Sequence, residues 1–300
     1  MLDILTQSAL GAEDFNQQVE WVIPDFLAKR MITMVYADGG NGKSWLGLAV
    51  AKQCALAGMD VAFLDFDNPL TVLKERGVHE KMVQGFPNLN YIHRSKCPVD
   101  PLELLRQLAA NAVSGRFNNM IIIIDSLRNF TDVTNDAKTM VALNFLMDIR
   151  EAGATILVLH HSNKDGKNYQ GSNNIRNSVD NMYQLSKLEM SAGIGILLQV
   201  KKERAAIKDC AFDISPNNLD LIEEDLIEAQ STEQDLDFVN AIKSALQQQP
   251  LMNKTALLNA AGFEKDNKQA RARLDKYDGI YWDSIKKVNR TMYQLTNELS

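Results

Sequence analysis

The chain of 300 residues contains few cysteines, no long hydrophobic run and no basic start. Cys54, Cys97 and Cys210 are odd in number and widely separated, which argues against a disulfide framework or a zinc site and favours a reducing cytoplasm. No apolar stretch approaches the roughly 20 residues that a membrane span needs. The acidic N-terminal sequence MLDILTQSALGAEDF is unlike a signal peptide. We therefore expect a cytoplasmic protein without a membrane segment.

Internal repeats and low-complexity tracts are also lacking. With 45% hydrophobic and 23% charged residues, the chain is long enough for one full α/β core and a smaller domain. The formal net charge of −6 argues weakly against nucleic acid as a partner when it is taken alone. The distribution of the charges is more informative than their sum.

Apolar runs typical of strands alternate with segments of helical spacing. This alternation predicts an α/β fold with a mostly parallel sheet. A polar, acidic stretch, Glu223–Asp237, is predicted to be a linker, so we expect one domain over residues 1–230, with residues 1–25 as an arm, and a second over residues 231–300. The predicted strands are Ile32–Tyr36, Val61–Phe66, Leu89–Ile92, Met120–Ile124, Thr155–Leu159 and Ile194–Val200, and the predicted helices include Trp45–Ala57, Pro101–Ala112 and Thr139–Ala152.

The segment MITMVYADGGNGKSWLGL, residues 31–48, joins an apolar strand to a helix through a glycine-rich turn. Such a turn points several backbone N–H groups at one anion, while Lys43 reaches the β- and γ-phosphates and the Ser44 hydroxyl holds Mg²⁺. The usual pattern begins with glycine where this chain has Ala37, whose methyl group is tolerable if φ is negative. The alternative is a chance GKS in a surface turn. The predicted ATP-contacting residues are Gly39, Gly40, Asn41, Gly42, Lys43, Ser44 and Trp45.

Carboxylates end two other predicted strands. Asp125 follows a run buried on both faces, which puts it beside the phosphate loop, where it would hold Mg²⁺ through water or accept a hydrogen bond from Ser44. A water-positioning carboxylate is expected after the strand that ends near Asp65 and Asp67, and we favour Asp67, with Asp65 second. The alternatives are a simple helix cap at Asp125 and a structural Asp-Asn-Pro turn at residues 67–69.

Two polar segments follow later strands. His161 ends one of them, and a zinc site there lacks support because His79 and His93 lie in unrelated segments. Basic residues at the exit of the last strand reach a neighbouring subunit's nucleotide as an arginine finger, with Arg204 favoured and Lys202 second, unless this run is a solvated turn. The loop from Lys164 to Arg176 is either an ordinary solvated loop or a DNA-binding loop. Its candidate DNA contacts are Lys164, Lys167, Tyr169 and Arg176.

These motifs together resemble the RecA-fold ATPases of the RepA-like hexameric helicase group, relatives of DnaB-type replicative helicases. The resemblance covers about Gln18 to Cys210. It rests on Trp21-Val-Ile-Pro24, the GKS loop, Ile-Ile-Asp125-Ser126-Leu-Arg128-Asn129, His160-His161-Ser-Asn-Lys164 with Gly171-Ser172, and Lys202-x-Arg204.

The resemblance implies a hexameric ring that uses ATP and Mg²⁺. Each nucleotide would lie between protomers, and the loops after His161, the implied γ-phosphate sensor, would line a channel for single-stranded DNA. The family usually has Glu where this chain has Asp67 and Gly where it has Ala37, and the shorter Asp67 makes the rate of hydrolysis doubtful. One subunit would supply Lys43, Ser44, Asp67, Asp125 and His161, and the next would supply Lys202 and Arg204.

The tail predicts a winged helix. Helices are expected at Phe238–Leu246, at Asn253–Ala261 with Asn253 as N-cap and Gly262 at the end, and at Asn267–Tyr277, with strand-like pieces at Ile280–Ser284 and Thr291–Leu295. Three helices and a hairpin are typical of a DNA-reading winged helix, although protein contacts or ring packing are the alternative. The candidate DNA contacts are Arg271, Arg273, Lys286, Lys287 and Arg290.

The favoured function is therefore that of an ATP-dependent DNA helicase or translocase, acting as a ring on single-stranded or forked DNA, with a primase or polymerase as a possible partner. Two alternatives stay open. One is a RecA-like DNA-binding ATPase that loads, pairs or repairs DNA without unwinding it. The other is a KaiC-like regulatory ATPase whose partner is a protein.

Overall fold

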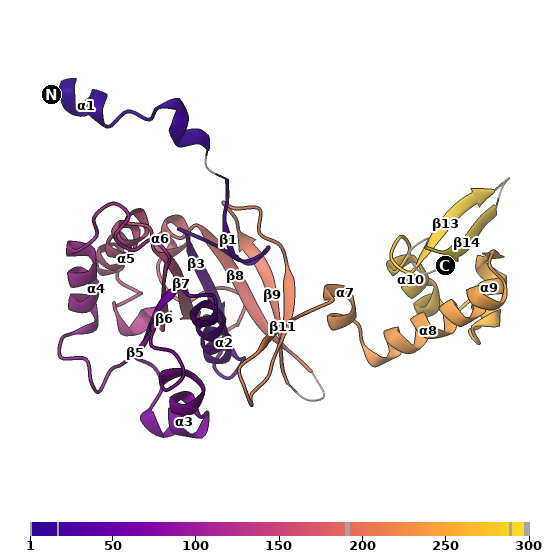
Figure 1. The fold of residues 1–300 in the computed structure, drawn as a ribbon. Coiled ribbons are helices and arrows are strands. Elements are labelled where there is room, and N and C mark those ends of the chain that lie inside the picture. The colour runs from indigo at the N-terminus through magenta and orange to yellow at the C-terminus, as the bar shows by residue number, and fades with distance from the viewer. Residues whose placement is uncertain (1, 17, 190–192, 288–289, 297–300) are drawn as a thin grey trace. The chain divides into compact units, whose positions relative to one another are not determined.

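The computed structural model describes residues 2–16, 18–189, 193–287 and 290–296 (Figure 1). The chain divides into two compact units, Met1–Leu226 and Ile227–Ser300, and each is described by itself. In the described part of the chain, no helix has the length and apolar character needed to cross a membrane.

A nine-stranded sheet forms the centre of the first unit. The strands from β8 to β5 are parallel, and β9, β10 and β11 continue the sheet antiparallel. All six predicted strands are present, and β8, β10 and β11 were not predicted. In spatial order the strands are β11 (Leu221–Glu224), β10 (Cys210–Ile214), β9 (Ile194–Lys202), β8 (Asn181–Leu188), β3 (Ile32–Ala37), β7 (Thr155–His161), β6 (Met120–Asp125), β4 (Asp60–Asp65) and β5 (Leu89–His93).

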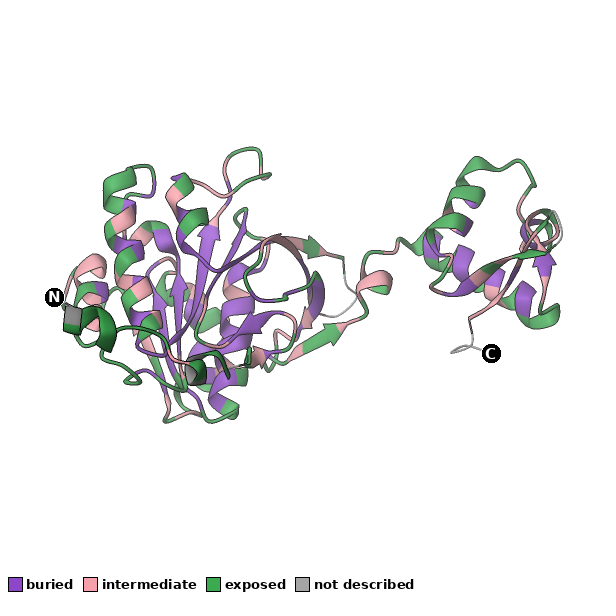
Figure 2. Ribbon diagram, turned by 90° about the horizontal axis from the view of Figure 1, so that it is seen from above, coloured by how far each residue is buried: buried purple, intermediate pink, exposed green. Residues whose placement is uncertain are grey.

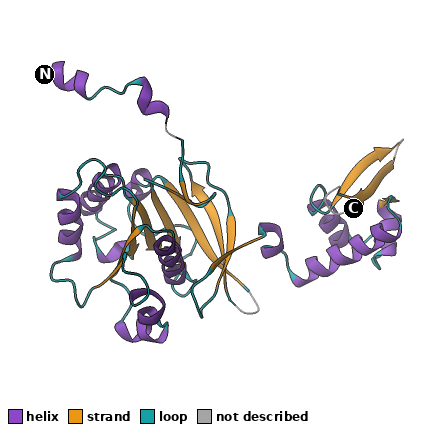
Figure 3. Ribbon diagram, in the orientation of Figure 1, coloured by secondary structure: helices purple, strands orange, loops and turns teal. Residues whose placement is uncertain are grey.

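Helices cover both faces of this sheet (Figure 3). Alternate residues of β6 show the two layers: Ile121 and Ile123 pack in the core that contains α2 (Lys43–Leu56), and Ile122 and Ile124 pack in the core of the other face. The central strands are accordingly buried along their length (Figure 2). The other α-helices of this unit are α1 (Leu2–Gln7), α3 (Leu70–Glu75), α4 (Pro101–Ala110), α5 (Asp136–Glu151) and α6 (Asn173–Ser178), and β1 (Trp21–Ile23) pairs with β2 (Leu27–Ala28). The short helix α7 (Leu226–Ala229) spans the boundary between the two units.

The predicted α/β fold with a mostly parallel sheet is confirmed. β7 lies between the phosphate-loop strand β3 and the Asp125 strand β6, as the resemblance implies for the strand that carries a polar sensor. Part of the predicted arm belongs to this unit as well, because Ile23 of β1 is buried in its core.

The boundary between the two units, after Leu226, falls inside the predicted linker Glu223–Asp237, but the stretch has regular secondary structure. This stretch contains the end of β11, all of α7 and the start of α8 (Glu233–Gln248). A capping box begins α8: Thr232 Oγ1 accepts from Asp235 N (3.1 Å), and the Asp235 side chain accepts from Thr232 N (3.3 Å). The polar residues that suggested a linker are therefore partly helix-capping groups.

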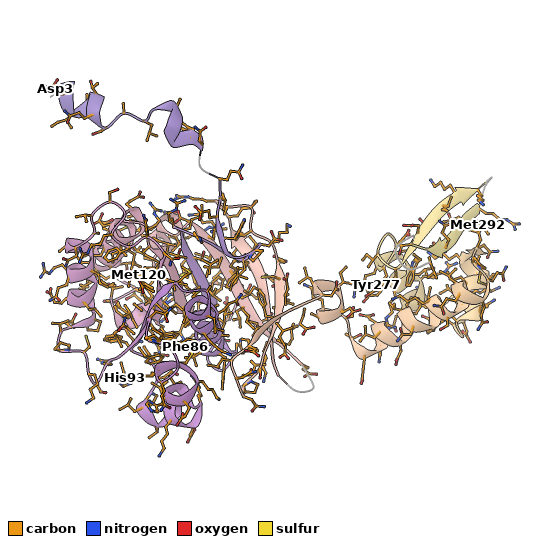
Figure 4. The ribbon with its side chains drawn as sticks, viewed as in Figure 1. Asp3, Phe86, His93, Met120, Tyr277 and Met292 are labelled. Carbon is orange, nitrogen blue, oxygen red and sulfur yellow. The ribbon has the colours of Figure 1, made fainter. Side chains whose placement is uncertain are left out.

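The second unit has three longer helices and a small antiparallel sheet of order β12-β14-β13. Its core includes Phe238, Tyr277 and Trp282, and Tyr277 is labelled in Figure 4. Asn253 caps α9 as predicted, because its Oδ1 accepts from Ala256 N. The predicted wing passes through residues 288–289, which lie outside the described residues. Besides α8 the elements are β12 (Met252–Asn253), α9 (Lys254–Ala260), α10 (Lys268–Lys276), β13 (Trp282–Lys287) and β14 (Arg290–Leu295).

Candidate nucleotide-binding site

The glycine-rich turn lies between the end of β3 and the start of α2. Gly40 and Gly42 have φ angles of 83° and 99°, a region that L side chains rarely adopt. A Cβ on Gly42 would also lie 3.2 Å from Ile196 Cγ2. Ala37 is a buried, extended residue of β3, so its methyl group fits without positive φ.

Lys43 is buried beneath the turn. Its Nζ donates to the carbonyl oxygens of Ala37 (2.8 Å) and Asp38 (2.7 Å). Burial lowers the pKa of Lys43, and the nearby carboxylates of Asp125, Asp67 and Asp38 oppose that shift. The turn therefore holds a fixed cation at the N-terminus of a 14-residue helix, where anions are favoured.

A cleft of about 180 Å³ opens beside the turn. That volume exceeds the share of a single water molecule several-fold, so the cleft has room for a phosphate group. Four neighbouring parallel strands, β3, β7, β6 and β4, end here, and their carboxyl ends bring the predicted polar residues together. The lining residues are Gly39, Gly40, Gly42, Lys43, Ser44, Trp45, Asp67, Asn68, Arg76, Asp125 and His161.

Asp125 and Ser44, the predicted magnesium ligands, lie together in the cleft. Burial raises the pKa of Asp125 to about 6, and hydrogen bonds from Ser44 and Asn68 oppose the shift. Asn68 Nδ2 lies 3.2 Å from Asp125 Oδ2. A hydroxyl and a carboxylate are oxygen ligands that suit Mg²⁺ together with water and phosphate oxygens, so these residues fit the ion.

Asp65 and Asp67 have different surroundings. Asp65 is fully buried, and its carboxylate accepts from Asp67 N (3.2 Å), from Asn68 N (3.0 Å) and from the Tyr91 hydroxyl (2.6 Å). Asp65 therefore builds the turn after β4, whereas Asp67 lines the cleft.

Asp67 is held ionised by its neighbours. Its Oδ1 accepts from Asn129 Nδ2 (3.0 Å) and Arg128 Nη2 (3.1 Å), and His161 Nε2 lies 3.6 Å from its Oδ2. The His161 side chain contributes most to holding the pKa of Asp67 well below its usual range, against the opposite effect of burial. A carboxylate of low pKa is a weak proton acceptor, so Asp67 is better suited to orient water than to deprotonate it.

The structure adds cleft residues that sequence reasoning missed. Arg76 lies 5.4 Å from the centroid of the Trp45 ring and donates from Nη1 to Asn68 Oδ1 (3.2 Å). Asn68 is the other missed residue of the cleft, and Arg128 and Asn129, which were also missed, bind Asp67. The Asp-Asn-Pro turn could have pointed to Asn68, and the motif at the end of the Asp125 strand could have pointed to Arg128 and Asn129. No sequence pattern pointed to Arg76.

The loop after His161 folds back onto the phosphate loop. Ser162 Oγ donates to Asp38 Oδ1 (2.5 Å), and Gln184 Nε2 of β8 donates to the Gly166 carbonyl (2.9 Å). Tyr169 is half-buried, and its ring forms an edge-to-face pair with the ring of Tyr36. Lys164 and Lys167 are exposed, and Arg176 donates to the Lys201 carbonyl (3.1 Å).

The two arginine-finger candidates, Lys202 and Arg204, differ in their partners and in their exposure. Lys202 Nζ is bound by the carbonyl oxygens of Arg176 (2.5 Å) and Val179 (2.6 Å) and so caps the end of α6. Arg204 is 53% exposed and donates to Asp180 Oδ1 (2.8 Å). Arg204 is thus the better placed of the two cations to meet an external anion.

Both candidates lie at the opposite edge of the sheet from the cleft. Arg204 donates to Asp180, which accepts from Ile32 N at the start of β3, and Lys202 donates to the carbonyl of Val179, whereas the phosphate loop follows the end of β3. From Ile32 to Ala37 a strand covers about 16 Å, at ~3.3 Å per residue. The structure therefore does not bring Arg204 to the cleft of its own chain.

The basic residues of the second unit are also of two kinds. Arg273 donates from Nε to Asp235 Oδ1 (2.7 Å) and from Nη2 to Gln234 Oε1 (3.0 Å), so it belongs to the packing of α8. The other four predicted DNA contacts are exposed, namely Arg271, Lys286, Lys287 and Arg290.

No model of a known protein family matches the chain, and no curated relative does. Among solved structures it is similar to the flagellar accessory protein FlaH from Methanocaldococcus jannaschii, at 15% identity over 66% of this chain and 90% of that one, with a TM-score of 0.45. It is also similar to the RadB recombinase, at 17% identity over 66% and 93% of the two chains, with a TM-score of 0.47. The account of function therefore depends on the geometry of the site itself.

Proposed function

We propose that this chain binds ATP with Mg²⁺ and hydrolyses it to drive movement on DNA. The observation that carries the proposal is the convergence of a buried lysine, a hydroxyl–carboxylate pair and an ionised carboxylate in one cleft at the end of a glycine-rich turn. Phosphoryl transfer needs mainly positioning and charge stabilisation, and this cleft offers both.

Each residue has a distinct part in the hydrolysis. Lys43 and the N–H groups of the turn neutralise the phosphates, and Ser44 with Asp125 would hold Mg²⁺, which would screen the phosphate charge when bound. Asp67 orients the attacking water. His161 senses the γ-phosphate from the end of β7, and its Nε2 has no hydrogen-bond partner among the described residues.

DNA is the proposed substrate of the motor. The exposed Lys164 and Lys167 lie on a loop that Ser162 ties to Asp38 of the phosphate loop, so a strand bound there is linked to the nucleotide site through a few bonds. In the second unit, three helices, a small sheet and exposed cations support a winged helix that binds DNA.

A ring is the proposed assembly. Arg204 and the cleft lie at opposite sheet edges, so a head-to-tail arrangement of copies would place the Arg204 of one copy at the nucleotide of the next. We take the ring to be hexameric and the activity to be unwinding of forked DNA, as in the helicase group that the sequence resembles.

The test combines three measurements on the full chain, with Lys43→Ala as the control. ATP turnover is measured with and without single-stranded DNA, strand displacement on a forked duplex, and mass with and without ATP. We expect turnover stimulated by DNA, displacement, and a hexamer with ATP. Stimulation without displacement would favour a RecA-like DNA-binding ATPase, and turnover indifferent to DNA would favour a regulatory ATPase with a protein partner.

A further inference from the structure

Two arginines and a backbone amide converge on one buried carboxylate at the sheet edge opposite the cleft. Asp180, just before β8, accepts from Ile32 N (2.8 Å) and from Arg150 Nη1 (2.9 and 3.0 Å to its two oxygens). It also accepts from Arg204 Nη1 (2.8 Å), and only 5% of its side chain is exposed. A buried carboxylate bonded on both oxygens is fixed in place, and so is the group that it holds.

Asn181, the residue after Asp180, fixes the backbone of Arg204 and Ala205. Asn181 is fully buried, and its Oδ1 accepts from Arg204 N (3.0 Å) and Ala205 N (3.2 Å). Ala205 is itself part of the core. Arg204 is therefore held at both ends, its backbone by Asn181 and its guanidinium by Asp180.

Arg204 keeps donors that the cluster does not use. Arg150, at the end of α5, pairs with Glu151 as well as with Asp180, so the two carboxylates and the two guanidiniums of the cluster balance in charge. The Arg204 side chain is 53% exposed against 18% for Arg150. A guanidinium has five N–H donors in a rigid fork, and the bond to Asp180 engages only its Nη1 end.

We infer that Asp180, together with Asn181, positions Arg204 to meet the phosphates of a nucleotide bound to a neighbouring copy of this chain. This inference rests on the proposed function, in which Arg204 acts between subunits. Asp180 touches no phosphate and is a positioning residue. Its effect on rate is nevertheless large, because a displacement of about 1 Å in a catalytic group costs on the order of a hundredfold.

The test is a double-mutant cycle on ATP turnover by the full chain. Asp180→Asn keeps the shape and removes the charge that holds Arg204, and we expect kcat to fall about tenfold to a hundredfold while ATP binds with unchanged affinity. In the Arg204→Ala background the same substitution changes kcat less than about twofold, because the group that it positions is gone. Asp209→Asn is the matched control, since Asp209 accepts from Val200 N of β9 (2.7 Å) and does not hold Arg204.

The outcomes separate this inference from the function on which it rests. Normal turnover by Arg204→Ala, or no turnover by the wild type, would overturn both. A different outcome is that Arg204→Ala hydrolyses ATP slowly and Asp180→Asn lowers kcat as much in that background as in the wild type. This outcome would overturn only the positioning role and would make Asp180 a structural residue. An Asp180→Asn variant with wild-type kcat would do the same.

A second variant covers the case in which Asp180→Asn does not fold. Asn181→Ala releases the backbone of Arg204 and Ala205 and leaves the Asp180 ion pairs in place. In the same cycle it should lower kcat with Arg204 present and have no effect without it. Equal losses in both backgrounds would contradict the inference.

Discussion

Charged side chains gather at both ends of the parallel strands, but their surroundings differ between the carboxyl ends and the amino ends. At the carboxyl edge, Lys43 is held by two carbonyl oxygens, and Nε2 of His161 has no hydrogen-bond partner among the described residues. At the other edge, Asp180 binds two arginines and a backbone amide. Lys43, Asp67 and His161 thus line an open cleft with room for a phosphate group, whereas Asp180 holds Arg204 in a fixed position.

The largest effect that tests this comparison is expected at the carboxyl edge. Lys43→Ala should abolish ATP turnover and leave the protein folded, because it removes the cation fixed under the phosphate loop. Turnover and circular dichroism of the purified variant check this. Lys52→Ala is the control, since Lys52 lies farther along α2 and pairs with Asp220 (2.6 Å). Near-normal hydrolysis by Lys43→Ala would contradict the site.

The second prediction separates the two neighbouring carboxylates. Asp67→Asn should stop hydrolysis and retain ATP binding, because it removes the charge that orients water and preserves the shape. Single-turnover hydrolysis and a binding titration distinguish the two effects. Asp60→Asn, at the exposed start of β4, is the matched control. Should Asp65→Asn give this pattern and Asp67→Asn not, the roles of the two residues are reversed.

These residues show why local sequence was sufficient for part of the site. Lys43, Ser44 and Asp125 belong to short motifs in which the neighbouring residues determine the geometry, so the sequence predicted both the fold class and these positions. Asp180 and Arg76 were missed because their functions depend on partners distant in the chain: Ile32 lies 148 positions from Asp180. The choice between Asp65 and Asp67 was left open for a similar reason, because the hydroxyl of Tyr91 comes from β5 and the side chain of Arg128 comes from the short helix Leu127–Asn129 after β6.

The third prediction concerns the two proposed DNA surfaces. Replacing Lys164 and Lys167 with Ala should weaken single-strand binding and remove DNA stimulation of ATP turnover, because only this loop is bonded to the phosphate loop. Replacing Arg271, Lys286 and Lys287 with Ala should flatten the salt dependence of binding, by about one unit of log–log slope per lost phosphate contact.

DNA at saturating concentration should still stimulate ATP turnover after Arg271, Lys286 and Lys287 are replaced with Ala. Arg273 is left unchanged because it pairs with Asp235. Affinity and ATP turnover measured against salt concentration check both sets. Tail variants with wild-type affinity and slope would make the second unit a protein-contact or ring-packing module.

The smallest effect is expected in the segment that looked like a linker. Thr232→Ala removes the cap of α8 and should cost about 1 kcal/mol of local stability. Amide hydrogen exchange over Glu233–Gln248 measures it, with Thr255→Ala, at an exposed position of α9, as the control. Unchanged protection of α8 would show that the capping box does not stabilise it.

In the proposed ring, Arg204 of one copy completes the cleft of another copy, and mixing Arg204→Ala protein with wild-type protein tests this arrangement. Arg204→Ala protein should bind ATP and hydrolyse it on the order of 10³-fold more slowly. When this variant is titrated into wild-type protein at constant total concentration, we expect ATP turnover to fall more steeply than the wild-type fraction, because each Arg204 serves a neighbour's nucleotide. Turnover strictly proportional to the wild-type fraction would contradict this arrangement.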